Sequence, residues 1–154
     1  DFRADMQTGM RGRSPQIGEK LFVEATCAQC HKAGTAGVGQ VGPDLAQVFS
    51  RWKGDGAAVL QEILDPSHRI DDKYAVHVVL TVDGLTVSGL VVEDTKDHIA
   101  IMENPEAKEP TVIPRDDIER VVKTSNSMMP KGLLDRYSKD EVFEILAFIL
   151  SVQQ

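Results

Sequence analysis

The feature that most constrains this chain is a pentapeptide near its start, Cys27-Ala28-Gln29-Cys30-His31. It holds the only two cysteines among the 154 residues and one of the four histidines. Two residues between the thiols let one turn of chain present both sulfurs together. The adjacent imidazole then lies where a ring nitrogen can bind a metal. The pentapeptide therefore predicts a site built from two thiols and one imidazole.

This spacing is the attachment pattern of c-type haem, in which thioether bonds join both sulfurs to the vinyl groups of the porphyrin. Three other interpretations stay open. A redox-active Cys-x-x-Cys pair needs a thioredoxin-like context and a following helix, whereas residues 32–37 form a flexible loop. A zinc site needs further ligands at metal spacing, whereas His68, His77 and His98 are scattered. The third is a structural disulfide.

Composition limits the fold and the partners. A length of 154 residues is that of about one domain, and 42% hydrophobic with 27% charged residues is typical of soluble globular proteins. The formal charge of −7 argues against nucleic acid as the main partner. No window approaches the ~18 apolar residues of a transmembrane helix. Residues 1–13 lack periodicity and the apolar run of a signal peptide, so we expect a flexible segment there, a mature end or a cut from a longer protein.

Helices are predicted on both sides of the middle of the chain. Ser14-Pro15 predicts the start of a helix that ends near Thr26, with an inward face of Ile17, Leu21, Phe22 and Ala25. A short helix is expected over 45–53, and another over 56–64 that stops at Asp65-Pro66. Ser138 and Glu141 form a capping box that opens the C-terminal helix. Its broad apolar face contains Val142, Phe143, Ile145, Leu146, Ala147, Ile149 and Leu150.

The middle of the chain reads as strands. Residues 74–82 alternate in polarity, with Tyr74, Val76, Val78, Leu80 and Val82 on the more apolar face. Asp83-Gly84 predicts a two-residue type I′ turn into a returning strand over 85–92. Further strands are expected over 98–102 and 111–113, whereas residues 115–123 have helical spacing. Residues 93–119 hold nine acids and three bases, so most of the negative charge lies there.

A haem iron bound by one histidine has an open sixth position. The loop Ser127-Met128-Met129-Pro130-Lys131-Gly132 precedes the C-terminal helix, and a methionine before proline can be held rigidly toward that position. Met102 ends a strand, which favours a place in the core. His68, His77 and His98 are further candidate ligands, and Met128 is an alternative to Met129.

These elements together resemble the class I cytochromes c. The resemblance rests on the pentapeptide at the end of a helix, the Gly42-Pro43-x-Leu45 loop, Met129-Pro130 and the amphipathic C-terminal helix. It implies His31 as the proximal ligand and Met129 as the distal one, with the Pro43 carbonyl accepting a hydrogen bond from the His31 ring. It also implies that Gly18 and Phe22 meet the C-terminal helix near Phe148.

His31 and Met129 lie 98 positions apart, and this spacing and the strands between them are similar to the cytochrome c-like haem-binding domain of planctomycetes and verrucomicrobia. That resemblance rests on Asp65-Pro66-Ser67, Tyr74, Asp83-Gly84, Gly89 and Ser127-x-Met129-Pro130-x-Gly132-Leu133. It implies a mainly α cytochrome c fold in one domain over 14–154, with a small antiparallel β insertion at about 74–113.

The function implied is electron transfer, without enzymatic activity, by one covalently attached haem c with His31 and Met129 on the iron. Redox proteins, such as a dehydrogenase donor and an oxidase or cytochrome acceptor, would be the partners of a free carrier or of a domain from a larger dehydrogenase. Haem attachment of this kind implies an exported, periplasmic location. A haem enzyme or gas sensor with a displaceable distal ligand is the alternative. The β insertion is either a structural cap over the haem or a docking surface for a basic partner or for dimerisation.

Overall fold

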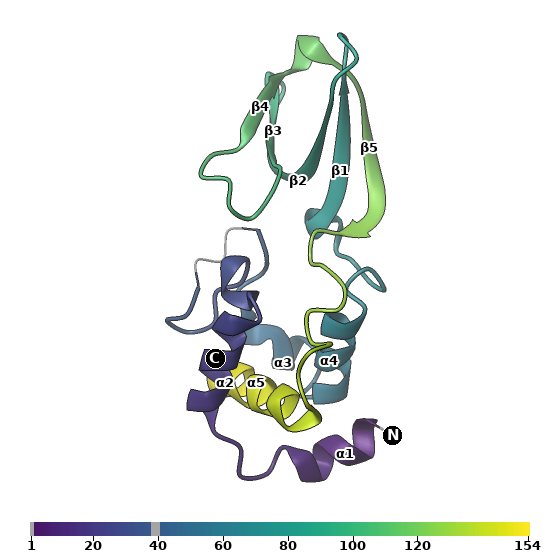
Figure 1. Cartoon of the computed structure of the whole chain (residues 1–154). Coiled ribbons are helices and arrows are strands. Elements are labelled where there is room, and N and C mark those ends of the chain that lie inside the picture. The colour runs from purple at the N-terminus through teal and green to yellow at the C-terminus, as the bar shows by residue number, and fades with distance from the viewer. Residues whose placement is uncertain (1, 38–40) are drawn as a thin grey trace. The chain divides into compact units, whose positions relative to one another are not determined.

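A computed structural model describes residues 2–37 and 41–154 and divides the chain into two compact units (Figure 1). The helical unit comprises the chain up to Pro66 and again from Pro130 to Gln154, and the β unit comprises Ser67–Met129. Within the described ranges, no helix combines the length and the apolar character needed to cross a membrane. The sequence predicted a mainly α domain with an insertion at about 74–113, whereas the inserted unit is wider and contains a five-stranded antiparallel sheet.

The helices follow the predicted caps closely. Their bounds are α1 Phe2–Gly9, α2 Pro15–Glu24, α3 Val48–Arg51, α4 Gly56–Leu64 and α5 Lys139–Ser151, with 3₁₀ turns at Cys27–Gln29 and Leu45–Gln47. The Ser14 side chain caps α2, and the predicted capping box of Ser138 and Glu141 opens α5. Asp55 caps α4 by accepting hydrogen bonds from the backbone of Ala57 and Ala58. These ends form where predicted because capping is local chemistry.

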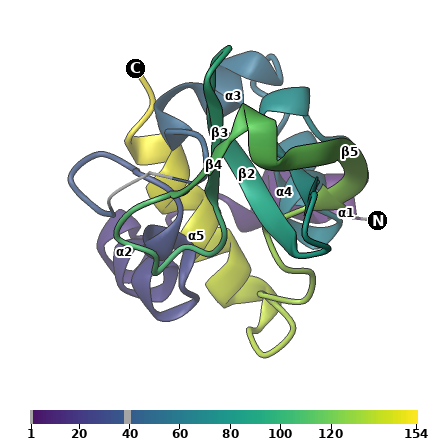
Figure 2. The same ribbon diagram turned by 90° about the horizontal axis from the view of Figure 1, so that it is seen from above.

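Helices α2 and α5 pack directly against each other (Figure 2). A Cβ atom on Gly18 would collide with the Glu144 carbonyl and lie 2.8 Å from the Cβ of Phe148, so only glycine permits this approach. The rings of Phe22 and Phe148 meet edge to face with centroids 5.3 Å apart. The predicted meeting of Gly18 and Phe22 with the C-terminal helix is therefore confirmed.

Two predictions about inward faces are wrong. Ile17 is 51% exposed, because the face of α2 that meets α5 is centred on Gly18 and Phe22. Leu150 is 48% exposed although Phe148 and Ile149 beside it are buried, so the covered face of α5 is narrower than predicted. In both cases helical spacing identified the helix, and the position of its neighbour decided which side is buried.

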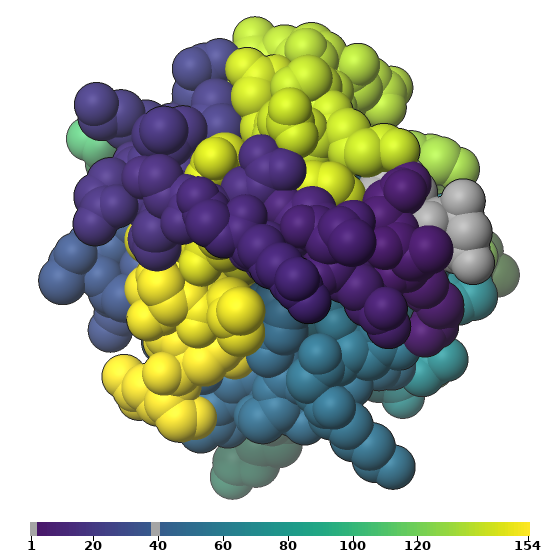
Figure 3. All heavy atoms as spheres, turned by 90° about the horizontal axis from the view of Figure 1, so that it is seen from below, coloured from purple at the N-terminus to yellow at the C-terminus, as the bar shows by residue number. Residues whose placement is uncertain are grey.

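Residues 1–13 were predicted to be irregular, yet Phe2–Gly9 form α1. Met6 is buried in the helical core, and its methyl group would lie 2.7 Å from a Cβ atom on Gly56. In the space-filling view the purple N-terminal segment lies against the yellow C-terminal helix and the blue-teal α4 (Figure 3). This helix is held by tertiary contacts, among them burial of Met6 and the ion pair of Asp5 with Lys139, which no local capping pattern predicts.

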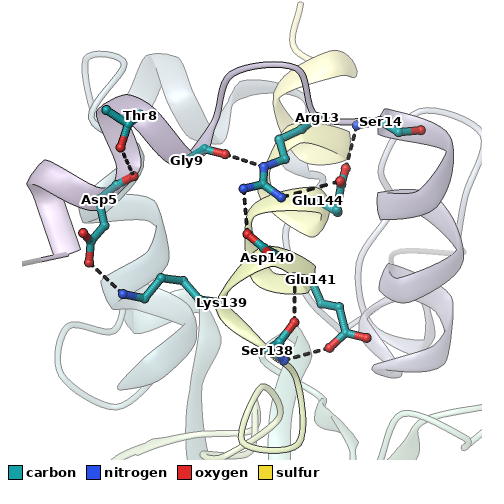
Figure 4. A network of polar contacts seen from close by, with 10 residues as sticks. All are labelled: Asp5, Thr8, Gly9, Arg13, Ser14, Ser138, Lys139, Asp140, Glu141 and Glu144. Atoms are coloured by element: carbon teal, nitrogen blue, oxygen red, sulfur yellow. Dashed lines mark hydrogen bonds and ion pairs between the residues drawn. The ribbon is translucent and has the colours of Figure 1, made fainter.

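Arg13 joins α1, α2 and α5 in a polar network (Figure 4). Its guanidinium donates to the Gly9 carbonyl and to Asp140, approaches Glu144 at 3.8 Å, and stacks over the Phe143 ring at 5.4 Å. Lys139 pairs with Asp5 of α1 at 2.8 Å. The Arg13 side chain is only 18% exposed and Glu144 16%, whereas Asp140 is 79% exposed, so the network is buried on its Glu144 side and open to solvent at Asp140.

The β unit is one sheet of five antiparallel strands in the order β4-β3-β2-β1-β5. The strands are β1 Ala75–Thr81, β2 Thr86–Asp94, β3 His98–Met102, β4 Thr111–Pro114 and β5 Ile118–Ser127. Val79, Ile99, Ile101 and Ile113 form its core. The predicted strands at 98–102 and 111–113 are thus confirmed.

The β1–β2 connection differs from the predicted two-residue turn. Thr81 and Leu85 close the hairpin, and of the two predicted turn residues only Gly84 has a positive φ, at +87°, which is one short of a type I′ turn. The buried face of β1 holds Ala75, Val79 and Thr81, so the predicted burial of the alternate face is also wrong. Thr81 tolerates burial because its hydroxyl accepts the Leu85 N–H at 3.0 Å and donates within the turn.

Residues 115–123 were predicted to be helical, yet they form a 3₁₀ turn at Arg115–Asp117 and then the edge strand β5. Ile118, Val121 and Val122 are spaced as on one face of a helix. Strand β5 has no buried face, so its apolar residues do not alternate with the two-residue period that marks a half-buried strand. Pairing of Val78 with Val122 and of Val79 with Val121 holds the strand. Its β-branched residues suit that extended backbone.

Candidate functional site

The pentapeptide forms a single tight turn at the end of α2. Thr26 adopts the left-handed conformation with φ 67° and ends the helix, and the 3₁₀ turn Cys27–Gln29 follows. The Cys27 carbonyl accepts the backbone N–H groups of Cys30 at 3.2 Å and of His31 at 2.9 Å. Both thiols and the imidazole therefore come from one closed turn whose backbone is already satisfied by hydrogen bonds.

The imidazole of His31 is fixed by a backbone carbonyl. Its Nδ1 lies 2.8 Å from the Pro43 oxygen, so the hydrogen bond implied by the resemblance is present. A carbonyl oxygen only accepts, and the proton must therefore reside on Nδ1. The other nitrogen, Nε2, then keeps its lone pair, which is the state that a metal-ligating histidine needs.

A glycine leaves room for this ring. A Cβ atom on Gly42 would lie 2.7 Å from Cε1 and 2.8 Å from Nδ1 of His31, closer than such atoms approach. The Gly42 N–H donates to the Cys30 carbonyl at 3.0 Å, and the Leu45 N–H donates to the Lys32 carbonyl at 2.9 Å. The second half of the predicted glycine-rich loop thus wraps the pentapeptide, while residues 38–40 of that loop lie outside the described residues.

Sequence reasoning noted Gly42 as part of a motif but missed its contact with the imidazole ring. The available signal was a glycine placed directly before the proline whose carbonyl holds His31. Gly37 has a related role, because a Cβ atom there would collide with the His31 carbonyl oxygen, and its φ is +79°.

Burial keeps the groups of this site uncharged. It raises the pKa of the Cys27 thiol to about 11, and the neighbouring Cys30 adds to the rise. Burial also lowers the pKa of His31, against the opposing effect of the Pro43 carbonyl. A thiol of this kind is protonated at neutral pH, unlike the low-pKa thiolate of a redox-active Cys-x-x-Cys pair. The turn also follows a helix rather than opening one.

These residues fit a covalently attached haem. Cys27 and Ala28 pack against the apolar core of the helical unit, so the Cys27 thiol stands at an apolar surface that suits a macrocycle. The donor set is two thiols for attachment and one imidazole nitrogen for iron. Among the residues that the structure describes, no three or more His, Cys, Asp or Glu side chains gather as a site for a bare metal ion.

The remaining candidate residues lie in the β unit. Met129 is its last residue and is half-buried, with its N–H donated to Ser127 Oγ at 3.1 Å, and Met128 is also half-buried. Met102 is buried in β3, as predicted. His68 is exposed, His77 Nδ1 lies 2.9 Å from the Ala75 carbonyl oxygen, and His98 pairs with Glu93 at 3.1 Å.

Comparison with known proteins gives one family. The model of the family described as Cytochrome c matches residues 15–103, which is more than half of the chain. That range includes α2, the pentapeptide, the loop with Pro43 and three strands of the sheet. No curated protein matches the chain.

Proposed function

The chain belongs to the cytochrome c family, and from this we propose that it carries single electrons through one haem attached to Cys27 and Cys30. The observation that carries the proposal is the 2.8 Å hydrogen bond from His31 Nδ1 to the Pro43 carbonyl, next to the closed thiol turn. It leaves Nε2 as the basic nitrogen of a preformed ligand. The family supports haem-based electron transfer in general, and the assignments to residues are our own.

In the proposal each residue of the site has a separate task. The sulfurs of Cys27 and Cys30 would hold the haem through thioether bonds, and His31 would bind the iron from one side. Gly42 gives the imidazole its room, and Pro43 fixes its orientation. When bound, haem supplies an iron centre that gains and loses one electron. The packing of Cys27 and Ala28 against the core places the attachment side next to apolar residues.

Met129 is the proposed second ligand. Its thioether is a soft donor that favours reduced iron, which suits a carrier of relatively high potential. The proposal follows the resemblance to class I cytochromes, in which the ligating methionine directly precedes proline. Two ligands that stay bound in both oxidation states minimise rearrangement when an electron moves.

The proposed setting is an exported compartment such as the periplasm, where haem of this type is attached. The partners would be redox proteins that meet the carrier in small, transient contacts. The planctomycete and verrucomicrobial type of domain is part of the same proposal, supported by the compact β unit that is inserted in the sequence between the two segments of the helical unit.

Two measurements test this function. A coloured protein should keep its pigment after denaturation and extraction with acidic organic solvent, and C27A/C30A should lose it. The oxidised protein should show a far-red sulfur-to-iron charge-transfer band, and the reduced protein should resist carbon monoxide. Met129→Ala should remove the band and admit carbon monoxide.

Met128→Ala is the matched control, because it removes the neighbouring thioether and leaves Met129 in place. If only Met128→Ala removes the band, then Met128 and not Met129 is the ligand, and our assignment is wrong. A colourless protein, or one whose pigment is extracted, would refute haem attachment. Rapid carbon monoxide binding by the unmodified reduced protein would instead support a sensor or enzyme.

A further inference from the structure

We infer that Ser67 and Ser127 are positioning residues for Met129, and that together they restrain the release of its thioether. The inference rests on the proposed function, because it takes Met129 as the ligand. It adds a means by which the chain regulates how readily that ligand leaves. Neither serine is needed for haem attachment, so their effect can be measured apart from it.

A relay of hydrogen bonds connects the three residues. The Met129 N–H donates to Ser127 Oγ at 3.1 Å, and the Ser127 N–H donates to Ser67 Oγ at 3.1 Å. The second bond joins residues 60 positions apart, so it fixes the Met129 segment to a distant part of the chain. The backbone of Met129 is thus anchored on its N-terminal side.

A second anchor lies on the C-terminal side of Met129. Lys131 Nζ lies 3.8 Å from Asp65 Oδ1, and both residues belong to the helical unit. The lysine side chain is 75% exposed, so this pair contributes little and is weakened by salt. In the serine relay, the bond from the Met129 N–H to Ser127 Oγ is partly buried, whereas the bond from the Ser127 N–H to Ser67 Oγ is exposed.

Both anchors end in one tripeptide, Asp65-Pro66-Ser67. Asp65 caps the C-terminus of α4, and its N–H donates to the Gln61 carbonyl at 2.9 Å. Pro66 is buried and has a fixed φ, which stiffens the step from helix to serine. Ser67 thus contacts the residue two positions before Met129, and Asp65 contacts the residue that follows Pro130.

The restraint has a defined effect on ligand release. A thioether held near its bound position rebinds without first ordering its loop, so the fraction of released ligand stays small. Loss of one neutral hydrogen bond should raise that fraction roughly two- to tenfold. An external ligand enters only when the thioether has left, and its rate of binding reports the released fraction.

The experiment uses the full chain with its haem attached. The rate of carbon monoxide binding to the reduced protein is measured for the unmodified chain and for Ser127→Ala, Ser67→Ala, Ser127→Thr and Ser125→Ala. Ser125 is the matched control, since it is an exposed serine on the same strand. We expect a roughly two- to tenfold faster rate for the two alanine variants of the relay. Ser127→Thr keeps the hydroxyl and should restore the slow rate, as should the control.

The outcomes separate the inference from the proposed function. If the unmodified protein shows the far-red band and resists carbon monoxide, but Ser127→Ala and Ser67→Ala match Ser125→Ala, the relay does not restrain Met129 and the inference fails alone. If the unmodified protein lacks the band, methionine ligation fails and the inference falls with it. Should Ser127→Ala not fold, Ser67→Ala breaks the relay at its other bond, from the Ser127 N–H to Ser67 Oγ, and decides the matter.

Discussion

The two units differ in the hydrophobic core that stabilises each of them. The helical unit has a large core of aromatic and aliphatic residues, and α2 and α5 approach so closely that their contact requires Gly18. The β unit has a small aliphatic core of Val79, Ile99, Ile101 and Ile113, while its edge strand β5 is exposed along most of its length. The β unit also carries 12 acids and 7 bases, a net charge of −5. The closely packed unit thus contains the thiols and the imidazole, and the acidic unit with the smaller core contains Met129, the proposed second ligand.

The strongest test of this difference is a cavity in each core. Leu146 and Ile101 are both fully buried, and replacing either with alanine should cost about 2–5 kcal/mol of unfolding free energy. The two clusters share no residue, so each substitution should lower hydrogen-exchange protection mainly in its own unit. Equal loss of protection in both units from either variant would show that they unfold together.

A smaller effect is expected from crowding the imidazole. Gly42→Ala places a methyl group 2.7 Å from His31 Cε1, so the ring must shift, at a cost of about 1–3 kcal/mol. The change should alter the haem absorption spectrum as well as stability. Gly54→Ala is the control, because Gly54 has φ +77° and open space around it, and it should lower stability with no spectral change. Identical absorption spectra for the two variants would show that crowding at Gly42 does not disturb the haem ligand.

Local caps should matter equally in both units. Ser138→Ala removes the hydroxyl that accepts the Glu141 N–H, and Thr81→Val removes the hydroxyl that accepts the Leu85 N–H. Each should cost about 1 kcal/mol in denaturant unfolding. A much larger loss for Thr81→Val would indicate that the β unit depends on its hairpin more than on its core.

The smallest effect is electrostatic and has a counterpart in each unit. A hydrogen bond from Lys139 lowers the pKa of Asp5, and one from Lys123 lowers the pKa of Asp72. A carboxyl whose folded pKa is lowered stabilises the fold above its unfolded pKa of 3.8, and that contribution is lost as pH falls through the folded value. NMR titration should show both pKa values rise to normal in Lys139→Ala and Lys123→Ala respectively. Added salt should reduce the lowering of both pKa values, since the carboxylates are exposed.

The helical unit could be predicted from sequence further than the β unit, for a physical reason. Ser14, Ser138 and Asp65-Pro66 mark helix ends through chemistry among neighbours, so α2, α4 and α5 were located closely. The pentapeptide and the Pro43 carbonyl are likewise close in sequence. By contrast, β5 depends on pairing with β1, as between Val78 and Val122, and burial of Met6 depends on a distant core. Such positions are decided by partners that no local pattern contains.

The hydrogen bond between Ser67 and Ser127 has a consequence for how such a chain can be rebuilt. This bond joins the first residue of the inserted unit to a residue near its end, 60 positions later. The two ends of the insertion therefore lie close together. A short peptide should therefore bridge that opening, and an unrelated module with similarly adjacent ends should be accepted in its place. The helical unit should therefore tolerate different insertions at this position, of which the five-stranded sheet is one.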